Sequence, residues 1–254
     1  MKEKKLDIDR QKHTVYSRRA KQAVQKRLEA EYGPEDADIL WGTVQKQYVA
    51  FLRECPEYGG KKNSKSSVIY DALLMFAWYA AVPHRPGTDE MRKLANDMFV
   101  EPAKKMKKVY GLGMPGGFKA AGKILIKQLE KDAKSCEKYD GFVSSGDAID
   151  PARGILAFHF DKCPLAEFAK ANGLEEMMPS LCNTEFRVVK ELSGELIRRG
   201  TVMSGDKCDF CVLKQDDPVA TCYITDVDEK GYLISRQIED QTAGDQAAED
   251  GGEE

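Results

Sequence analysis

The chain has 254 residues, of which 42% are hydrophobic and 32% charged, and its formal net charge is −3. This length suffices for one large domain or two small ones, and this composition is typical of a soluble globular protein. The charged first residues lack the apolar segment of a secretory signal, and the longest apolar run, residues 68–82, is shorter than the roughly 20 residues that cross a bilayer. We therefore expect a cytoplasmic protein without a membrane partner.

Charge is concentrated at both ends of the chain. Residues 1–30 carry ten Lys or Arg against four acids, whereas residues 239–254 carry seven acids and no Lys or Arg. The basic end could attract nucleic acid, but the solvated face of a helix explains it as well, so no nucleic-acid partner is expected. The acidic end cannot bury enough apolar surface to become ordered, so residues 237–254 are predicted to form a disordered tail.

The first 140 residues predict a helical subdomain. Helix formers, apolar periodicity and breaks at Gly or Pro indicate five helices, over residues 16–32, 34–52, 66–82, 88–110 and 118–135. The third is apolar nearly all round and should lie at the centre, where its single acid, Asp71, needs Lys61, Lys62 or a backbone group as a partner. Thr88 is expected to cap the fourth helix. The glycine-rich residues 111–117 lack the strand and the ending of a P-loop, so they are interpreted as a helix connector.

Residues 141–236 predict a mixed α/β part of the same unit. The pattern indicates strands over 155–160, 196–203 and 208–214, helices over 164–172 and 178–192, and a last hairpin from 219–224 and 232–235. The fold class is therefore α+β, with a helical N-terminal half followed by a mixed α/β C-terminal half with antiparallel hairpins.

The seven cysteines are odd in number and no export signal accompanies them, which argues against a disulfide framework. Three of them, Cys163, Cys182 and Cys208, each lie where a helix or strand is expected to begin or end. Side chains from separate elements often converge at such positions. Cys163 precedes Pro164 at a predicted helix start, where the helix dipole is expected to lower the thiol pKa.

Three interpretations of these thiols stay open. Three thiolates, or two with His159, could hold zinc and leave one position for water, although the long, irregular spacing is a weak metal signal. One thiolate could instead attack a substrate while His159, Glu185 or Asp209 moves protons. The third alternative is that all three are small buried hydrophobic side chains. On the predicted strand, Asp161 shares the face of His159 and could orient it.

The three cysteine segments together resemble the L-2-amino-thiazoline-4-carboxylic acid hydrolase family. The resemblance covers about residues 20–214, and its most specific part is the Gly-x-x-Cys-Asp-Phe sequence. Two departures are Glu185, where the family pattern leads us to expect Asp, and the hairpin and tail after residue 214, which look like additions. The matching positions are Cys163-Pro164, Cys182 with Glu185, Arg198, Thr201, Val202, Gly205 and Cys208-Asp209-Phe210, with the loop 59–63 before the apolar helix.

The resemblance implies a hydrolase that opens the cyclic C=N bond of an L-2-amino-thiazoline-4-carboxylate-like small molecule towards N-carbamoyl-cysteine. The three thiols are then candidates for addition to the amidine carbon, and Asp209, Glu185 and His159 for proton transfer. Arg198 or Arg199 would hold the substrate carboxylate with Thr201 nearby, and only one of the two arginines can face the pocket from a strand. We expect the three thiols to converge on one pocket, with Asp209 and one arginine at its rim.

The alternative is a non-catalytic small-molecule or metal-binding module, because the C-terminal half also resembles sensor-like domains related to vinyl reductases. No helix-turn-helix signature accompanies it, which favours the enzyme. The sequence requires no cofactor and leaves open both zinc and a homo-oligomer.

Overall fold

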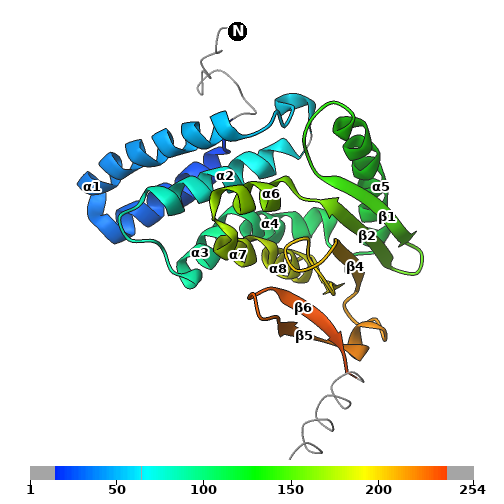
Figure 1. The fold of residues 1–254 in the computed structure, drawn as a ribbon. Helices are drawn as coiled ribbons and strands as arrows, with labels where there is room; N and C mark the ends of the chain where they lie inside the picture. The colour runs from blue at the N-terminus through cyan, green and yellow to red at the C-terminus, as the bar shows by residue number, and fades with distance from the viewer. Residues whose placement is uncertain (1–14, 64, 239–254) are drawn as a thin grey trace, which may run out of the picture.

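The computed structural model describes residues 15–63 and 65–238 (Figure 1), so the predicted tail lies outside the described residues apart from its first two. The α+β prediction is confirmed: a helical N-terminal half precedes antiparallel sheets. In the described part of the chain, no helix is long and apolar enough to cross a membrane. The helices are α1 (Arg18–Glu54), α2 (Ser66–Ala81), α3 (Thr88–Ala95), α4 (Glu101–Tyr110), α5 (Gly117–Cys136), α6 (Pro164–Asn172), α7 (Met178–Cys182) and α8 (Thr184–Glu191). The strands are β1 (Val143–Asp150), β2 (Ile155–Lys162), β3 (Gly194–Ile197), β4 (Cys208–Lys214), β5 (Tyr223–Val227) and β6 (Leu233–Gln237).

The helical half follows the sequence prediction closely. The first two predicted helices form one element, α1, which kinks at the predicted break because Gly33 has a φ of 78° and Pro34 follows it. The fourth predicted helix comprises α3 and α4, joined by a π-helical turn, Asn96–Val100. The predicted cap is wrong, because Thr88 is the first helical residue and Gly87 is the N-cap.

Helix α2 lies at the centre of the helical half, as predicted, and most of its side chains are buried. Its acid, Asp71, accepts hydrogen bonds from the backbone N–H of Ser17 at 2.5 Å and from the Ser17 hydroxyl at 2.8 Å. The same hydroxyl oxygen accepts the N–H of Ala20 and so caps α1. Burial raises the pKa of Asp71. Asp71 therefore fixes the start of α1 on α2 through a backbone group and a hydroxyl rather than through Lys62.

Two hydrophobic clusters organise the interior. The helical core joins α1, α2 and α3 to α6, α7 and Tyr232, so it contains residues from both halves of the chain. The sheet core lies between one face of β2, β3 and β4 and the helices α5 and α8 (Figure 1). The buried members of the sheet core are Leu112, Phe118, Leu156, Leu196, Cys208, Phe210 and Val212.

The main sheet has the antiparallel order β1-β2-β4-β3. Residues directly opposite on neighbouring strands point to the same face, so the register assigns side chains to faces. Phe160 is opposite Cys208, and His159 is opposite Asp209. The strand β1 was not predicted, because it is a mostly exposed edge strand with the polar sequence Val-Ser-Ser-Gly-Asp. The strand predicted over 196–203 ends already at Ile197.

The glycine-rich segment 111–117 is a connector, as predicted. The N–H of Leu112 donates to the carbonyl of Leu192 at 2.7 Å, so the segment lies against the turn before β3. A Cβ atom on Gly113 would lie 3.2 Å from the Cβ of Ser193, and one on Gly117 would lie 2.2 Å from the carbonyl oxygen of Gly111. These close approaches explain the glycines without a bound phosphate.

The predicted last hairpin, β5–β6, is attached to the rest of the protein through Asn183 and Arg198. The amide of Asn183 donates to the carbonyl of Gly231 at 2.9 Å and accepts the N–H of Leu233 at 2.8 Å. In addition, the N–H of Ser235 donates to the carbonyl of Arg198 at 2.6 Å. Gln237, assigned to the tail in the sequence prediction, is the last residue of β6.

We predict that Asn183→Ala loosens this hairpin. The substitution leaves one backbone donor and one acceptor without their partner, so the free energy of unfolding should fall by about 1–3 kcal/mol. Amide hydrogen exchange of residues 223–237 should accelerate more than that of the α2 helix. As a control, Asn172→Ala removes only one bond, to the Phe168 carbonyl, and should leave exchange in the hairpin unchanged. Unchanged hairpin exchange in Asn183→Ala would contradict this account.

Candidate functional site

The three predicted thiols lie where the two hydrophobic cores meet. Cys163 follows β2 as the N-cap of α6, Cys182 is the last residue of α7, and Cys208 is the first of β4. Cys163 and Cys182 pack against the helical core, whereas Cys208 belongs to the sheet core. The negative charge of each thiolate would raise the pKa of the others, so the thiols are electrostatically coupled. Three distant segments of sequence thus lie close enough for the charges of their thiols to act on one another.

All three thiols are protonated at neutral pH. Burial raises the pKa of Cys163 to about 12 and that of Cys208 to about 11, and it raises the pKa of Cys182 well above its ordinary value. The expectation of a lowered pKa for Cys163 is wrong. The backbone N–H groups of Leu165 and Ala166 at the start of α6 favour its thiolate, without the geometry of a full hydrogen bond, but desolvation outweighs them.

Glu185 is the acidic side chain whose charge acts on these thiols. It lies in α8, three residues after Cys182, and its carboxylate raises the pKa of all three thiols. Burial raises its own pKa, and the charges of Arg198 and Lys65 oppose that shift. The side chain nevertheless keeps 42% of its surface accessible.

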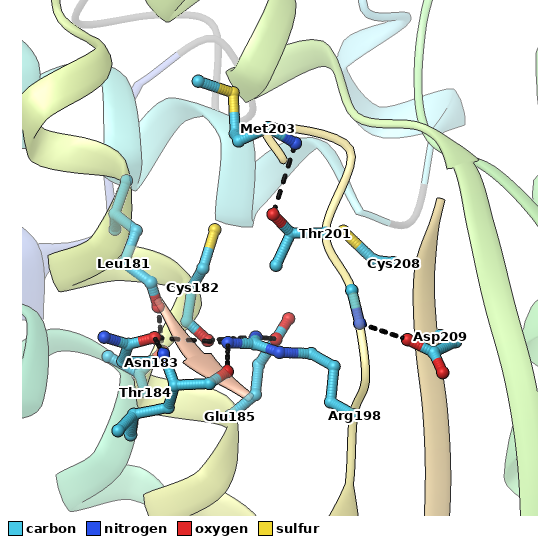
Figure 2. A network of polar contacts seen from close by, with 12 residues as sticks. Leu181, Cys182, Asn183, Thr184, Glu185, Arg198, Thr201, Met203, Cys208 and Asp209 are labelled. Atoms are coloured by element: carbon cyan, nitrogen blue, oxygen red, sulfur yellow. Dashed lines mark hydrogen bonds and ion pairs between the residues drawn. The ribbon is translucent and has the colours of Figure 1, made fainter. Parts of the chain in front are cut away.

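Arg198 is completely buried and holds Glu185 in place (Figure 2). Its Nη1 donates to Glu185 Oε2 at 2.7 Å and to the carbonyl of Cys182 at 2.8 Å. Its Nη2 donates to the carbonyl of Leu233 at 2.7 Å and to Asn183 Oδ1 at 3.2 Å. These bonds use all four Nη hydrogens. Of the donor atoms of Arg198, only Nε has no partner within the described residues. Arg198 therefore has no free pair of donors for the predicted bidentate clamp on a substrate carboxylate.

Arg199, Asp209 and His159 lie on the opposite face of the sheet from the thiols. Asp209 follows Cys208 in β4, so strand alternation directs its side chain to the other face. Its Oδ1 accepts the backbone N–H groups of Arg199 and Gly200, and Figure 2 shows its bond to the β3–β4 connection. Arg199 Nε donates to Asp209 Oδ2 at 3.1 Å. As predicted, only one of the two arginines faces the thiols, and it is Arg198.

His159 shares this outer face with Asp161, as predicted. Its Nε2 lies 3.4 Å from Asp161 Oδ1, but its closer partner is Asp147 on β1, whose Oδ1 lies 2.8 Å from Nδ1. The structure thus joins His159 to carboxylates and does not bring it to the thiols. The sequence prediction missed Asp147, because it missed β1.

Thr201 is buried and shapes the turn before β4 (Figure 2). Its hydroxyl oxygen lies 3.0 Å from that of Ser204 and accepts the N–H of Met203 at 3.3 Å. In the same turn, the N–H of Val202 donates to the sulfur of Cys208 at 3.3 Å. Thr201 therefore positions the Cys208 thiol through the backbone of the turn. Its hydroxyl makes its hydrogen bonds within the same turn.

The donor groups do not form a metal site: in residues 15–63 and 65–238, no group of three or more His, Cys, Asp or Glu could hold a metal ion. One surface cavity of about 950 Å³ lies elsewhere, between the 112–119 connector, residues 151–153 and residues 214–218, and none of the predicted site residues lines it. The thiols and Glu185 thus remain the candidate site, as protonated thiols beside an acid.

Two residues near the thiols had no signal in the sequence. Lys65, just before α2, carries a charge that acts on Cys163 and Glu185. Tyr232, between β5 and β6, is buried, and the charges of Cys182 and Cys208 act on its phenol. Both come from loops whose positions depend on contacts far along the chain, which local patterns do not encode.

We predict that Arg198→Met lowers the free energy of unfolding by about 3–5 kcal/mol, because it leaves Glu185 and three backbone or amide acceptors without their buried donor. Arg199→Met is the matched control. Its side chain is 69% exposed, so the change should stay within about 0.5 kcal/mol. Urea unfolding of both variants measures the difference. Equal effects would contradict the assignment of Arg198 as the buried anchor.

We also predict slow alkylation of the three site thiols. In native protein treated with iodoacetamide at pH 8, mass spectrometry should find Cys222 modified first, because it is exposed. Cys163 and Cys208 should react more than about tenfold slower, since their raised pKa values leave little thiolate. Their rates should still rise between pH 8 and 10. In denaturant, all should react alike. Rapid modification of Cys163 at pH 7 would overturn the direction of its shift.

A model of the family described as L-2-amino-thiazoline-4-carboxylic acid hydrolase matches residues 66–212. The matched stretch includes all three cysteine segments and Glu185, and it ends before the β5–β6 hairpin. No curated protein and no solved structure matches the chain. Because the match covers more than half of the sequence, the chain belongs to the L-2-amino-thiazoline-4-carboxylic acid hydrolase family.

Proposed function

We propose that the protein hydrolyses an L-2-amino-thiazoline-4-carboxylate-like cyclic amidine to a product of the N-carbamoyl-cysteine type. The family name supports the substrate class. The observation that carries the proposal is Glu185, an acid of raised pKa whose charge acts on all three thiols of the family segments. Such an acid can both accept and return a proton.

Ring opening takes up one water molecule. Its oxygen is added to the ring carbon between nitrogen and sulfur, the carbon–sulfur bond breaks, and the ring sulfur leaves as a thiol. The ring nitrogen stays in the carbamoyl group. The reaction therefore needs a group that removes a proton from the nucleophile and then supplies one to the leaving sulfur. We assign both transfers to Glu185.

Two nucleophiles are compatible with this assignment. In the direct route, Glu185 activates the water that attacks the ring carbon. In the covalent route, a thiol gives its proton to Glu185, adds to the ring carbon and releases the ring sulfur, and water then cleaves the adduct and restores the thiol. We favour Cys182 as this thiol, because Glu185 lies three residues after it across the α7–α8 junction and is the strongest charged influence on its pKa.

The other predicted residues take supporting roles in this proposal. Arg198 holds Glu185, and Thr201 with its turn holds Cys208. Asp209, Arg199 and His159 lie on the other face of the sheet and stay outside the reaction.

The test is turnover of L-2-amino-thiazoline-4-carboxylate, which is measured as the release of free thiol. We expect the purified protein to hydrolyse it, and Glu185→Gln to lower kcat by about 10²–10⁴, because the amide cannot carry the proton. Glu191→Gln, at the end of the same helix, is the matched control and should keep full activity.

The individual Cys→Ala variants then separate the two routes. Loss of turnover in Cys182→Ala, with a mass increase on Cys182 in wild-type protein quenched during turnover, identifies the covalent route. Activity retained in all three variants identifies the water route. Binding of the compound without turnover in wild-type protein would contradict the hydrolase proposal and favour a sensor-like binding module.

A further inference from the structure

The proposed substrate carries a carboxylate, and the two arginines predicted to bind it are both engaged elsewhere. The Nη hydrogens of Arg198 all donate to protein acceptors, and Arg199 pairs with Asp209 on the far face of the sheet. A carboxylate desolvated among buried thiols needs a cation. Another cation, on the side of the sheet that carries Cys208, would have to meet this need.

Lys65 occupies that side. Its Nζ lies 4.3 Å from the ring centroid of Phe160 and 5.4 Å from that of Phe142. Phe160 is directly opposite Cys208 in the β2–β4 register, so Lys65 covers the same face that carries the Cys208 thiol. Cys163 follows Phe160 by three residues at the end of β2. The ammonium thus lies over an aromatic side chain that neighbours Cys208 across the two strands, and its charge interacts with that of Cys163.

The surroundings of Lys65 hold its ammonium in place without using all of its hydrogen-bond donors. Its side chain is 20% accessible, and Nζ lies 2.5 Å from Asp132 Oδ2. Asp132 also accepts hydrogen bonds from Gln128 and Ser144, so its carboxylate is fixed by α5 and β1. An ammonium has three donors, and this ion pair uses one of them. Burial lowers the pKa of Lys65, while Asp132 opposes that shift.

We propose that Lys65 binds the anionic group of the substrate beside the thiols, and so selects carboxylate-bearing cyclic amidines over neutral ones. This inference rests on the proposed function for the identity of the substrate, but the anion site itself is defined by residues of the chain.

The test compares two alkylating reagents of similar size, iodoacetate, which carries a carboxylate, and iodoacetamide, which is neutral. The ratio of their rates at Cys163 cancels any change in thiolate fraction and reports attraction of the anion. In Lys65→Met, we expect this ratio to fall about fivefold relative to wild type, because one partly buried charge is lost. Lys65→Arg should keep the ratio close to the wild-type value.

Matched variants guard against misfolding and non-specific charge effects. Lys65→Met combined with Asp132→Asn removes the unpaired buried acid and should show the same fall. Lys162→Met removes a lysine next to Cys163 in the chain whose partners are Asp140 and Glu167. Lys162 acts on Cys136, as Lys65 does, so its loss should change the ratio at Cys136 but not at Cys163.

An unchanged ratio at Cys163 in both Lys65→Met variants would overturn the anion site, whatever the activity of the protein. Conversely, a wild-type protein that fails to hydrolyse the thiazoline would contradict the proposed reaction and leave the alkylation result standing. The two proposals therefore fail separately.

Discussion

The buried guanidinium of Arg198 is the contact on which the arrangement of the candidate site depends. Complete removal of a guanidinium from water is costly, and only close partners offset that cost. Arg198 finds them in three parts of the chain: the α7–α8 junction at Cys182 and Asn183, the acid Glu185, and the β5–β6 hairpin at Leu233. It also lies 4.9 Å from the ring centroid of Phe186. One side chain thus ties the helical core, the sheet edge and the hairpin together.

This anchor sets the character of the proposed site. Glu185 stays beside the thiols because Arg198 holds one of its oxygens, and the positive charge offsets part of the desolvation that raises the Glu185 pKa. Burial keeps the thiols protonated. The hairpin, which lies outside the stretch matched by the family model, also belongs to this arrangement, since it supplies the Leu233 acceptor and places Tyr232 near Cys182 and Cys208.

Local patterns predicted much of the fold. The helices around Phe118 and Pro164 and the strand beginning at Cys208 have the predicted positions, because capping residues, glycines and apolar periodicity act within one element. The edge strand β1 was missed, because its polar residues carry no burial signal. Local patterns also could not identify the partner of Asp71. This partner, Ser17, lies 54 positions away, and only tertiary packing selects Ser17 rather than a lysine.

The site was predictable in part. The family pattern selected three thiols and Glu185, whose charges act on one another, but it could not separate structural from reactive side chains. The alternation of a strand already implies that Cys208 and Asp209 face opposite sides, and this argument applied before folding would have removed Asp209 from the pocket. Lys65 had no such signal, because its place over Phe160 is a tertiary contact between residues far apart in the chain.

The most direct measurement of the central claim is bridging of the site thiols by dibromobimane, a short reagent that becomes fluorescent when it links two nearby sulfurs. If Cys163, Cys182 and Cys208 surround one place, peptide mapping of the native protein after prolonged reaction at pH 9 should find bridges within this set. A Cys208→Ser variant should lose the bridges that include that residue and keep the one between Cys163 and Cys182. Single-site adducts only, or bridges to Cys55 or Cys136 in place of these, would contradict the shared site.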